Sequence, residues 1–136
     1  MRTSSKALAA LLGAALAIAS AAGAAPIDWT RFTDTQTIEI LTSDEDGDQR
    51  LTTVWIVVVD RAAYVRTGGT TWGDNVERNG TLKVRDLDDK QLRAEKVLSA
   101  AEVERVIAAF REKYGTTDAV MAVFRFGEPR VFRLVE

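Results

Sequence analysis

The run VWIVVV, from Val54 to Val59, constrains the fold more than any other segment of the chain. Side chains alternate between the two faces of a β-strand, so an apolar residue at every position requires both faces to be covered. We therefore expect a central strand, with the core on one face and a helix or a partner chain on the other. TIEILT before it and AYVRT after it predict neighbouring strands, joined to it by the turn SDEDGDQR and the tight connection DRA.

The rest of the sheet is predicted from three segments nearer the C-terminus. TLKVRDL and KQLRAEKVLS flank an Asp-rich turn, and RVFRLV has the pattern of a closing strand. The segment 119–126 fits either a short helix or a strand. Short connections between consecutive strands predict an antiparallel sheet of five to six strands.

The segment SAAEVERVIAAFREKYG predicts one long amphipathic helix near the C-terminus. Its apolar residues recur at i, i+3, i+4 and i+7, as Val103, Val106, Ile107 and Phe110. We expect Ser99 to cap the helix, Glu102 to reach back to Ser99, and Gly115 to end the helix in the left-handed conformation. A sheet covered by such a helix is an α+β small barrel or half-barrel.

Residues 1–24 are interpreted as a secretory signal peptide. Two basic residues precede an apolar run that is too short to span a bilayer comfortably, and small residues follow it. Cleavage after Ala24 leaves residues 25–136 as one domain, periplasmic or secreted and without a membrane attachment. A retained membrane anchor is the alternative interpretation.

The composition excludes several kinds of site. The sequence contains no cysteine and no histidine, which excludes disulfides, zinc sites built from sulfur or imidazole, and Ser-His-Asp or Cys-His catalysis. Acidic residues outnumber basic ones, so nucleic acid is not an expected partner. The acidic turn DEDGD is interpreted as a solvated hairpin turn and not as a metal site, because position 6 of a calcium loop starting at Asp44 would be Gln49 instead of glycine.

The segment RTGGTTWGDNVER, which follows the third strand, concentrates groups that bind anions. They are the forked guanidinium donors, the hydroxyl groups and the glycine amides of Arg66, Arg78, Thr67, Thr70, Thr71, Gly68 and Gly69. A short helix near 74–78 would add its N-terminal amides. Trp72 either folds back over the core or stacks on a flat ligand. Since no phosphate-loop motif is present, a phosphate cradle and a plain connection both remain open on this chemistry.

The order of these segments resembles the FMN-binding split β-barrel superfamily over residues 37–136. The resemblance rests on the Trp-bearing strand TTVWIVVVD, on AYVRTGG and WGDNVERNG after it, and on AFREKYG at the end of the helix. More narrowly, the chain looks like a group of small proteins related to the deazaflavin-dependent nitroreductases and, more distantly, to pyridoxamine phosphate oxidase.

The resemblance implies a homodimer that binds FMN or a deazaflavin where the two barrels meet. By position, Arg66 and Thr67 match the anion ligands at the end of a barrel strand. The expected cofactor-binding residues are Arg66, Thr67, Gly69, Thr71, Trp72, Asn75 and Arg78. Two functions stay open: an exported binder of a flavin-like or other phosphorylated, planar ligand, with or without oxidoreductase activity, and a non-enzymatic dimeric barrel that has lost the cofactor. The second function predicts no cleft beside Arg66.

Overall fold

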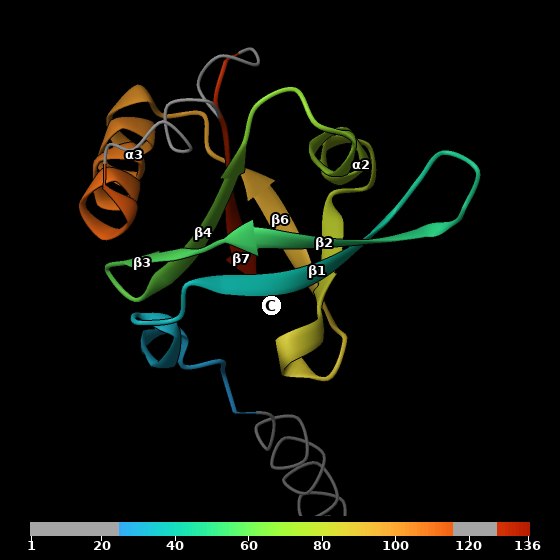
Figure 1. The fold of residues 1–136 in the computed structure, drawn as a ribbon, viewed down its shortest axis with the longest axis horizontal. Helices are drawn as coiled ribbons and strands as arrows, with labels where there is room; N and C mark the ends of the chain where they lie inside the picture. The colour runs from blue at the N-terminus through green and yellow to red at the C-terminus, as the bar shows by residue number, and fades with distance from the viewer. Residues whose placement is uncertain (1–24, 116–127) are drawn as a thin grey trace, which may run out of the picture.

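A computed structural model describes residues 25–115 and 128–136, so residues 1–24, interpreted above as a signal peptide, and the segment 119–126 lie outside the described residues. These residues form an α+β half-barrel, a curled antiparallel sheet with the strand order β2-β1-β5-β6-β7-β4-β3 (Figure 1). The strands are β1 Thr37–Ser43, β2 Gln49–Trp55, β3 Val57–Val59, β4 Ala62–Thr67, β5 Thr81–Val84, β6 Lys90–Lys96 and β7 Arg130–Val135. The helices are α2 Thr71–Asn79 and α3 Ala100–Tyr114, with 3-10 turns η1 Trp29–Phe32 and η2 Arg85–Leu87.

The segment that was expected to form one central strand forms two, because the chain bends at Ile56. β2 ends at Trp55 and β3 begins at Val57, and the two strands occupy opposite ends of the strand order. The predictions of a central strand and of five to six strands are therefore wrong. The expectation of two covered faces is confirmed, since Val54 and Ile56 enter one core cluster and Val57 enters another. Although β2 and β3 are the first and last strands of the sheet, the sheet curls, so the two faces of this segment contact two different cores.

The bend also brings the two ends of the sheet together. β2 comes close to β4, yet in the described part of the chain no ladder of backbone hydrogen bonds joins them (Figure 1). The sheet thus closes almost into a barrel and stays open along one line, which we call the β2–β4 seam.

The last turn of α3 holds the bend in place. The Tyr114 hydroxyl accepts a hydrogen bond from Ile56 N at 3.1 Å and lies 2.7 Å from the carbonyl oxygens of both Gln36 and Ile56, so its one proton is donated to either of them. Lys113 Nζ donates to the carbonyl oxygens of Thr35 at 2.6 Å and Ile56 at 2.8 Å. These bonds satisfy backbone groups that the bend removes from the sheet. Burial raises the pKa of Tyr114 and lowers the pKa of Lys113.

The caps of α3 agree with the sequence in part. Ser99 Oγ accepts a hydrogen bond from Glu102 N at 3.3 Å, as expected for the N-cap. The Glu102 carboxylate does not reach back to Ser99. It accepts a hydrogen bond from Tyr64 Oη at 2.8 Å and so ties the helix to β4. Gly115 has a φ of +82° but a ψ of −172°, which is not the left-handed helical conformation that was predicted.

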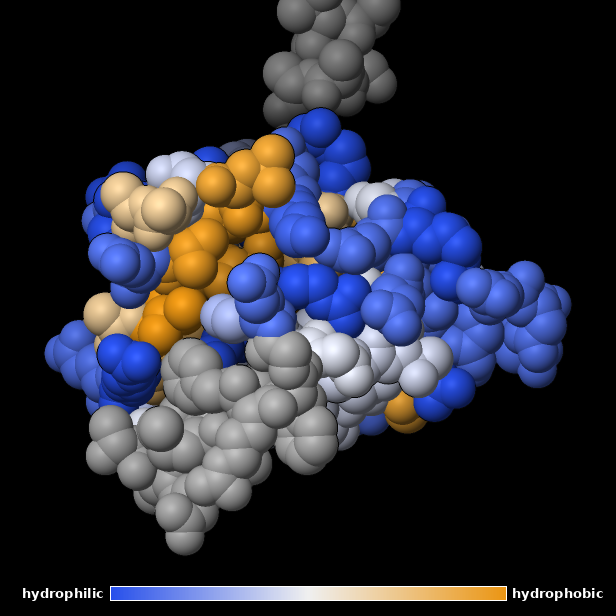
Figure 2. Space-filling model, turned by 90° about the horizontal axis from the view of Figure 1, so that it is seen from above, coloured by the Kyte–Doolittle hydropathy of each residue, from blue (hydrophilic) through white to orange (hydrophobic). Residues whose placement is uncertain are grey.

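Two apolar cores hold the sheet and the helices together. The inner core lies inside the curl and includes Trp29 and Phe32 of η1. The outer core lies between the sheet and α3, and Val106 and Phe110 are its buried helix residues. An apolar area also reaches the surface on the side of the molecule where α3 lies (Figure 2). Within residues 25–115 and 128–136, no helix is long and apolar enough to cross a membrane.

Candidate functional site

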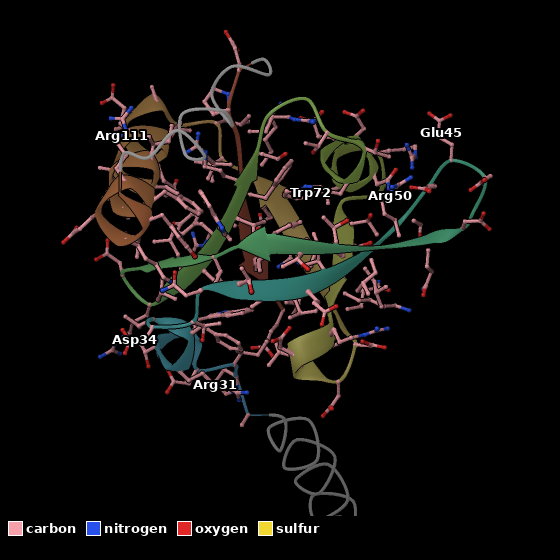
Figure 3. All side chains as sticks on the ribbon, in the orientation of Figure 1. Arg31, Asp34, Glu45, Arg50, Trp72 and Arg111 are labelled. Carbon is pink, nitrogen blue, oxygen red and sulfur yellow. The ribbon has the colours of Figure 1, made fainter. Side chains whose placement is uncertain are left out.

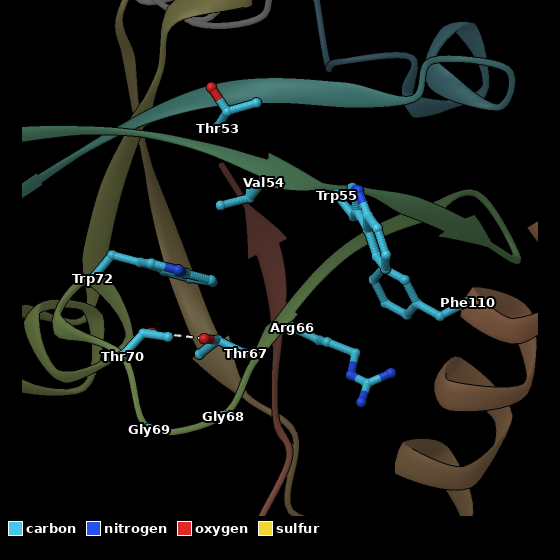
Figure 4. A pocket seen from close by; sticks show the side chains of 10 residues that line it. All are labelled: Thr53, Val54, Trp55, Arg66, Thr67, Gly68, Gly69, Thr70, Trp72 and Phe110. Atoms are coloured by element: carbon cyan, nitrogen blue, oxygen red, sulfur yellow. Dashed lines mark hydrogen bonds between the residues drawn. The ribbon is translucent and has the colours of Figure 1, made fainter. Parts of the chain in front are cut away.

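A cavity of about 480 Å³ opens at the β2–β4 seam, between the start of α2 and the side of α3 (Figure 4). Its lining residues come from β2, from the end of β4, from the connection after β4 and from one residue of each helix. They are Thr53, Val54, Trp55, Arg66, Thr67, Gly68, Gly69, Thr70, Trp72 and Phe110. The volume falls within the range of about 300 to 1,000 Å³ that small-molecule and cofactor sites occupy.

The connection between β4 and α2 forms one end of the cavity. It consists of Gly68, Gly69 and Thr70, and we call it the 68–70 loop. Thr70 is the N-cap of α2, because its Oγ1 accepts a hydrogen bond from Gly73 N at 3.2 Å. Thr67 Oγ1 lies 2.6 Å from Thr70 Oγ1, so the two hydroxyl groups form a pair at the end of β4. The predicted short helix is confirmed, and it begins at Thr71, earlier than expected.

Arg66 supplies the positive charge of the cavity. Its side chain extends toward α3, where the guanidinium carbon lies 5.7 Å from the centre of the Phe110 ring (Figure 4). The residue is only 9% exposed. Burial, with the positive charge of Arg111 as the second cause, lowers the pKa of Arg66 to about 10. An anion in the cavity would offset both effects, because it would restore a favourable environment for the guanidinium charge.

Aromatic rings line the apolar part of the cavity. Trp72 is 7% exposed and packs against Phe132, with the ring centres 6.3 Å apart, and it also lines the cavity (Figure 4). Of the two alternatives for Trp72, cover of the core is therefore confirmed, and contact with a ligand stays a prediction. Trp55 is half-buried and stacks on Tyr114, with the ring centres 4.5 Å apart at an angle of 8°. Together with Phe110, these rings offer flat apolar surfaces to a planar ligand.

The structure brings only part of the predicted site residues to this cavity. Arg66, Thr67, Gly69 and Trp72 line it. Thr71 lies next to the 68–70 loop, where its exposed side chain is not part of the lining.

Asn75 and Arg78 face the β1–β2 hairpin instead. Asn75 is 2% exposed, and its Nδ2 donates to Thr42 Oγ1 at 3.1 Å and to Asp44 Oδ1 at 2.7 Å. Arg78 Nη2 donates to Asn75 Oδ1 at 2.7 Å and to the Ser43 carbonyl oxygen at 2.8 Å. Both side chains thus attach α2 to β1. Helical spacing does not separate these residues from Trp72, which is itself three positions before Asn75. Their contacts do: Asn75 and Arg78 bond to Thr42 and Ser43, whereas Trp72 lines the cavity at the start of the helix.

One residue next to the site has no signal in the sequence. Arg130, the first residue of β7, contacts the 68–70 loop although it is about sixty residues away along the chain. Its Nε and Nη2 both donate to the Gly68 carbonyl oxygen, at 3.0 and 2.6 Å, and Nη2 also lies 3.3 Å from the Thr70 carbonyl oxygen. Its Nη1 donates to Asp74 Oδ1 at 2.9 Å and approaches Glu77 Oε2 at 3.4 Å. Arg130 comes next to the 68–70 loop only because β7 pairs with β4 in the sheet.

The acidic groups form no obvious metal site. Over the described ranges, no set of three or more carboxylates is arranged to hold a metal ion. No carboxylate is among the described residues that line the cavity. The cavity chemistry is therefore that of guanidinium, hydroxyl, backbone amide and aromatic groups.

No protein-family model matches this sequence, and no curated protein matches it. Solved structures match the fold. The chain is similar to HutZ, the heme storage protein from Vibrio cholerae, with a TM-score of 0.60 and 18% identity over 78% of this chain and 85% of that one. A conserved hypothetical protein from Mycobacterium tuberculosis has a TM-score of 0.57 and 21% identity over 77% and 76% of the two chains.

A pyridoxamine 5'-phosphate oxidase-like protein from Listeria innocua is also similar, with a TM-score of 0.54 and 14% identity over 74% of this chain and 82% of that one. At these identities the likeness shows the fold alone. The structural neighbours thus include heme proteins and pyridoxamine 5'-phosphate oxidase-like split barrels, which supports the split-barrel resemblance at the level of the fold.

Proposed function

We propose that this protein binds a planar aromatic ligand with an anionic tail, of the flavin mononucleotide class, in the cavity at the β2–β4 seam. The observation that carries the proposal is the pairing, in one cavity, of aromatic walls with the buried guanidinium of Arg66. An apolar wall suits a flat ring, and a buried cation at one end suits a phosphate. The alternative of a barrel without a ligand predicts no cleft beside Arg66, so the cavity counts against it.

The residues that line the cavity suit flavin better than heme. Both ligands are planar, and the structural neighbours include a heme storage protein as well as oxidase-like proteins. This sequence has no histidine or cysteine, and the side chains that line the cavity include no methionine or tyrosine, so no residue there is a usual ligand for heme iron. Flavin binding requires only stacking, hydrogen bonds and an anion site, all of which these residues can supply.

The chain's own residues would bind and orient the ligand. The ring would lie against Trp72 and Trp55, and the phosphate would lie between the Arg66 guanidinium and the backbone of the 68–70 loop. A bound flavin would itself supply redox chemistry. We further propose, from the signal-like leader and the resemblance, that the protein acts after export and as a homodimer.

Titration of the chain 25–136 with FMN and with riboflavin, followed by tryptophan and flavin fluorescence, tests the proposal. Riboflavin has the same ring but no phosphate. We expect FMN to bind at least about tenfold more tightly, since hydrogen bonds to charged groups contribute about 1.5 to 3 kcal/mol. The Arg66→Met variant should lower FMN affinity to the riboflavin level and leave riboflavin binding nearly unchanged.

Arg31→Met is the matched control, because it removes the same charge from an exposed residue of η1, far from the cavity (Figure 3). It should bind both flavins as the unchanged chain does. The proposal is wrong if the unchanged chain binds neither flavin at millimolar concentration. Tighter binding of heme than of FMN would contradict the choice of ligand class.

A further inference from the structure

Arg130 contacts the 68–70 loop from outside the cavity. It is not among the lining residues, although its guanidinium donates to the Gly68 carbonyl oxygen through two nitrogen atoms. Its side chain is 13% exposed, and its remaining nitrogen faces Asp74 and Glu77 of α2. These two carboxylates offset the positive charge of Arg130 locally, so its charge adds little to the potential in the cavity. Its direct effect is on the position of the loop.

The contact between Arg130 and the Gly68 carbonyl oxygen also fixes the direction of the next N–H group, that of Gly69. In a trans peptide the C=O and the following N–H lie in one plane and point in opposite directions, and the described residues contain no cis peptide bond. The Gly68 carbonyl points at Arg130, so the N–H of Gly69 points away from Arg130. Gly69 itself lines the cavity, whereas Arg130 does not. A backbone amide that faces a cavity beside a cation is a donor for an anion.

The fit around Arg130 is close. A Cβ atom at Gly73 would lie 2.5 Å from Arg130 Nη2 and 2.6 Å from Thr67 Cγ2. Real Cβ atoms essentially never make contacts this short, so a side chain at position 73 would require Arg130 or Thr67 to shift. Arg130 is therefore held by α2 on one side while it holds the loop on the other.

We propose that Arg130 is a positioning residue that orients the 68–70 loop so that the Gly69 amide binds the anionic group of the ligand, a phosphate monoester. This inference rests on the proposed function. It adds that recognition of the phosphate depends on a residue of β7 that does not touch the ligand.

The test uses two variants and two flavins. Arg130→Met removes both the charge and the fork of donors, and Arg130→Lys keeps the charge but cannot donate through two nitrogen atoms to one carbonyl. We expect both variants to bind FMN about tenfold more weakly and riboflavin within about twofold of the unchanged chain. Arg133→Met is the matched control, because Arg133 is an exposed residue of the same strand, and it should change neither affinity.

A second measurement needs no ligand. Amide hydrogen exchange followed by NMR should show faster exchange at Gly69 and Thr70 in Arg130→Lys, with the exchange of β5 and β6 unchanged. Unchanged loop exchange, or unchanged FMN affinity in Arg130→Lys, would overturn the positioning role. An equal loss of FMN and riboflavin binding would also overturn it, because that result indicates general destabilisation.

The two proposals fail in different ways. If the unchanged chain binds no flavin, the proposed function fails, and recognition of a phosphate through Gly69 fails with it. If the unchanged chain prefers FMN over riboflavin and the Arg130 variants keep that preference, the proposed function stands and only the role of Arg130 fails.

Discussion

Gly73, in the first turn of α2, has no free space for a Cβ atom. The space for a Cβ atom is taken by Arg130 Nη2 and Thr67 Cγ2, at 2.5 and 2.6 Å. Glycine inside a helix normally costs up to about 1 kcal/mol relative to alanine, so the helix alone would favour alanine here. Close packing with the end of β4 and with Arg130 reverses this preference.

We predict that Gly73→Ala lowers the free energy of unfolding by about 1 to 3 kcal/mol, the usual cost of overpacking, and weakens FMN binding. Urea unfolding and flavin titration measure the two effects. Gly80→Ala is the control. Gly80 has a φ of +71° and no atom within 4 Å of its Cβ position, so its substitution strains the backbone without reaching the cavity. An increase in stability in Gly73→Ala would contradict the predicted clash.

Single residues also show what could be predicted for the site. Arg66 and Thr67 were recognisable because they follow an apolar strand and precede two glycines, a purely local pattern. Arg130 was not, because its partners are about sixty residues away and no local pattern marks it. Asn75 carries a side chain suited to a ligand, yet its position on α2 turns it toward Thr42 and the hairpin.

At the scale of elements, the turn between β1 and β2 is attached to α2 through Asp44. Its carboxylate accepts hydrogen bonds from Arg50 Nε at 2.9 Å and from Asn75 Nδ2 at 2.7 Å. The hydrogen bond from Arg50, and then the one from Asn75, lower the pKa of Asp44 below its ordinary value of 3.8. A carboxyl group with a lowered pKa stabilises the fold above its unfolded-state value and loses this contribution as the pH falls through the folded-state value.

We therefore predict that stability declines below about pH 4, and that Asp44→Asn removes part of this decline. Urea unfolding at pH 7 and pH 3 measures it, and the effect should be small because the group is exposed to solvent. Asp48→Asn removes the same charge from the same turn and serves as the control. An identical decline in Asp44→Asn and in the unchanged chain would contradict the prediction.

The end of α3 and the bend at Ile56 form the second coupled pair of elements. We predict that Tyr114→Phe lowers the free energy of unfolding by about 1 to 3 kcal/mol, because the backbone groups of Ile56 lose a half-buried partner at the bend. Urea unfolding followed by tryptophan emission measures this loss. Phenylalanine keeps the ring on which Trp55 stacks, so the emission of the folded state should change little.

Tyr64→Phe is the matched control for this substitution. It loses one hydrogen bond, to Glu102, and leaves the bend intact, so its effect on stability should be smaller. Equal effects of the two substitutions would mean that the contacts at the bend have no special weight.

At the scale of the whole molecule, the strands at the two ends of the described sheet each have one edge without a strand partner. In the part of the chain that the structure describes, β3 pairs with β4 alone and β2 pairs with β1 alone. We propose that two copies pair through this strand region. Sedimentation velocity of the chain 25–136 should then give twice the monomer mass, and Val59→Lys should shift the population toward monomer while the far-ultraviolet spectrum is kept. A monomer at all concentrations would contradict the proposal.

The local structure of this protein can be read from short segments of its sequence. The strands, the cap at Ser99 and the turn residues follow from side-chain period and from hydrogen bonds between near neighbours, which a short segment contains in full. Tertiary structure alone decided the division at Ile56, the β2–β4 seam and the approach of Arg130 to the 68–70 loop. These features depend on contacts between segments that are distant along the chain, and a local pattern cannot specify which distant partner satisfies it.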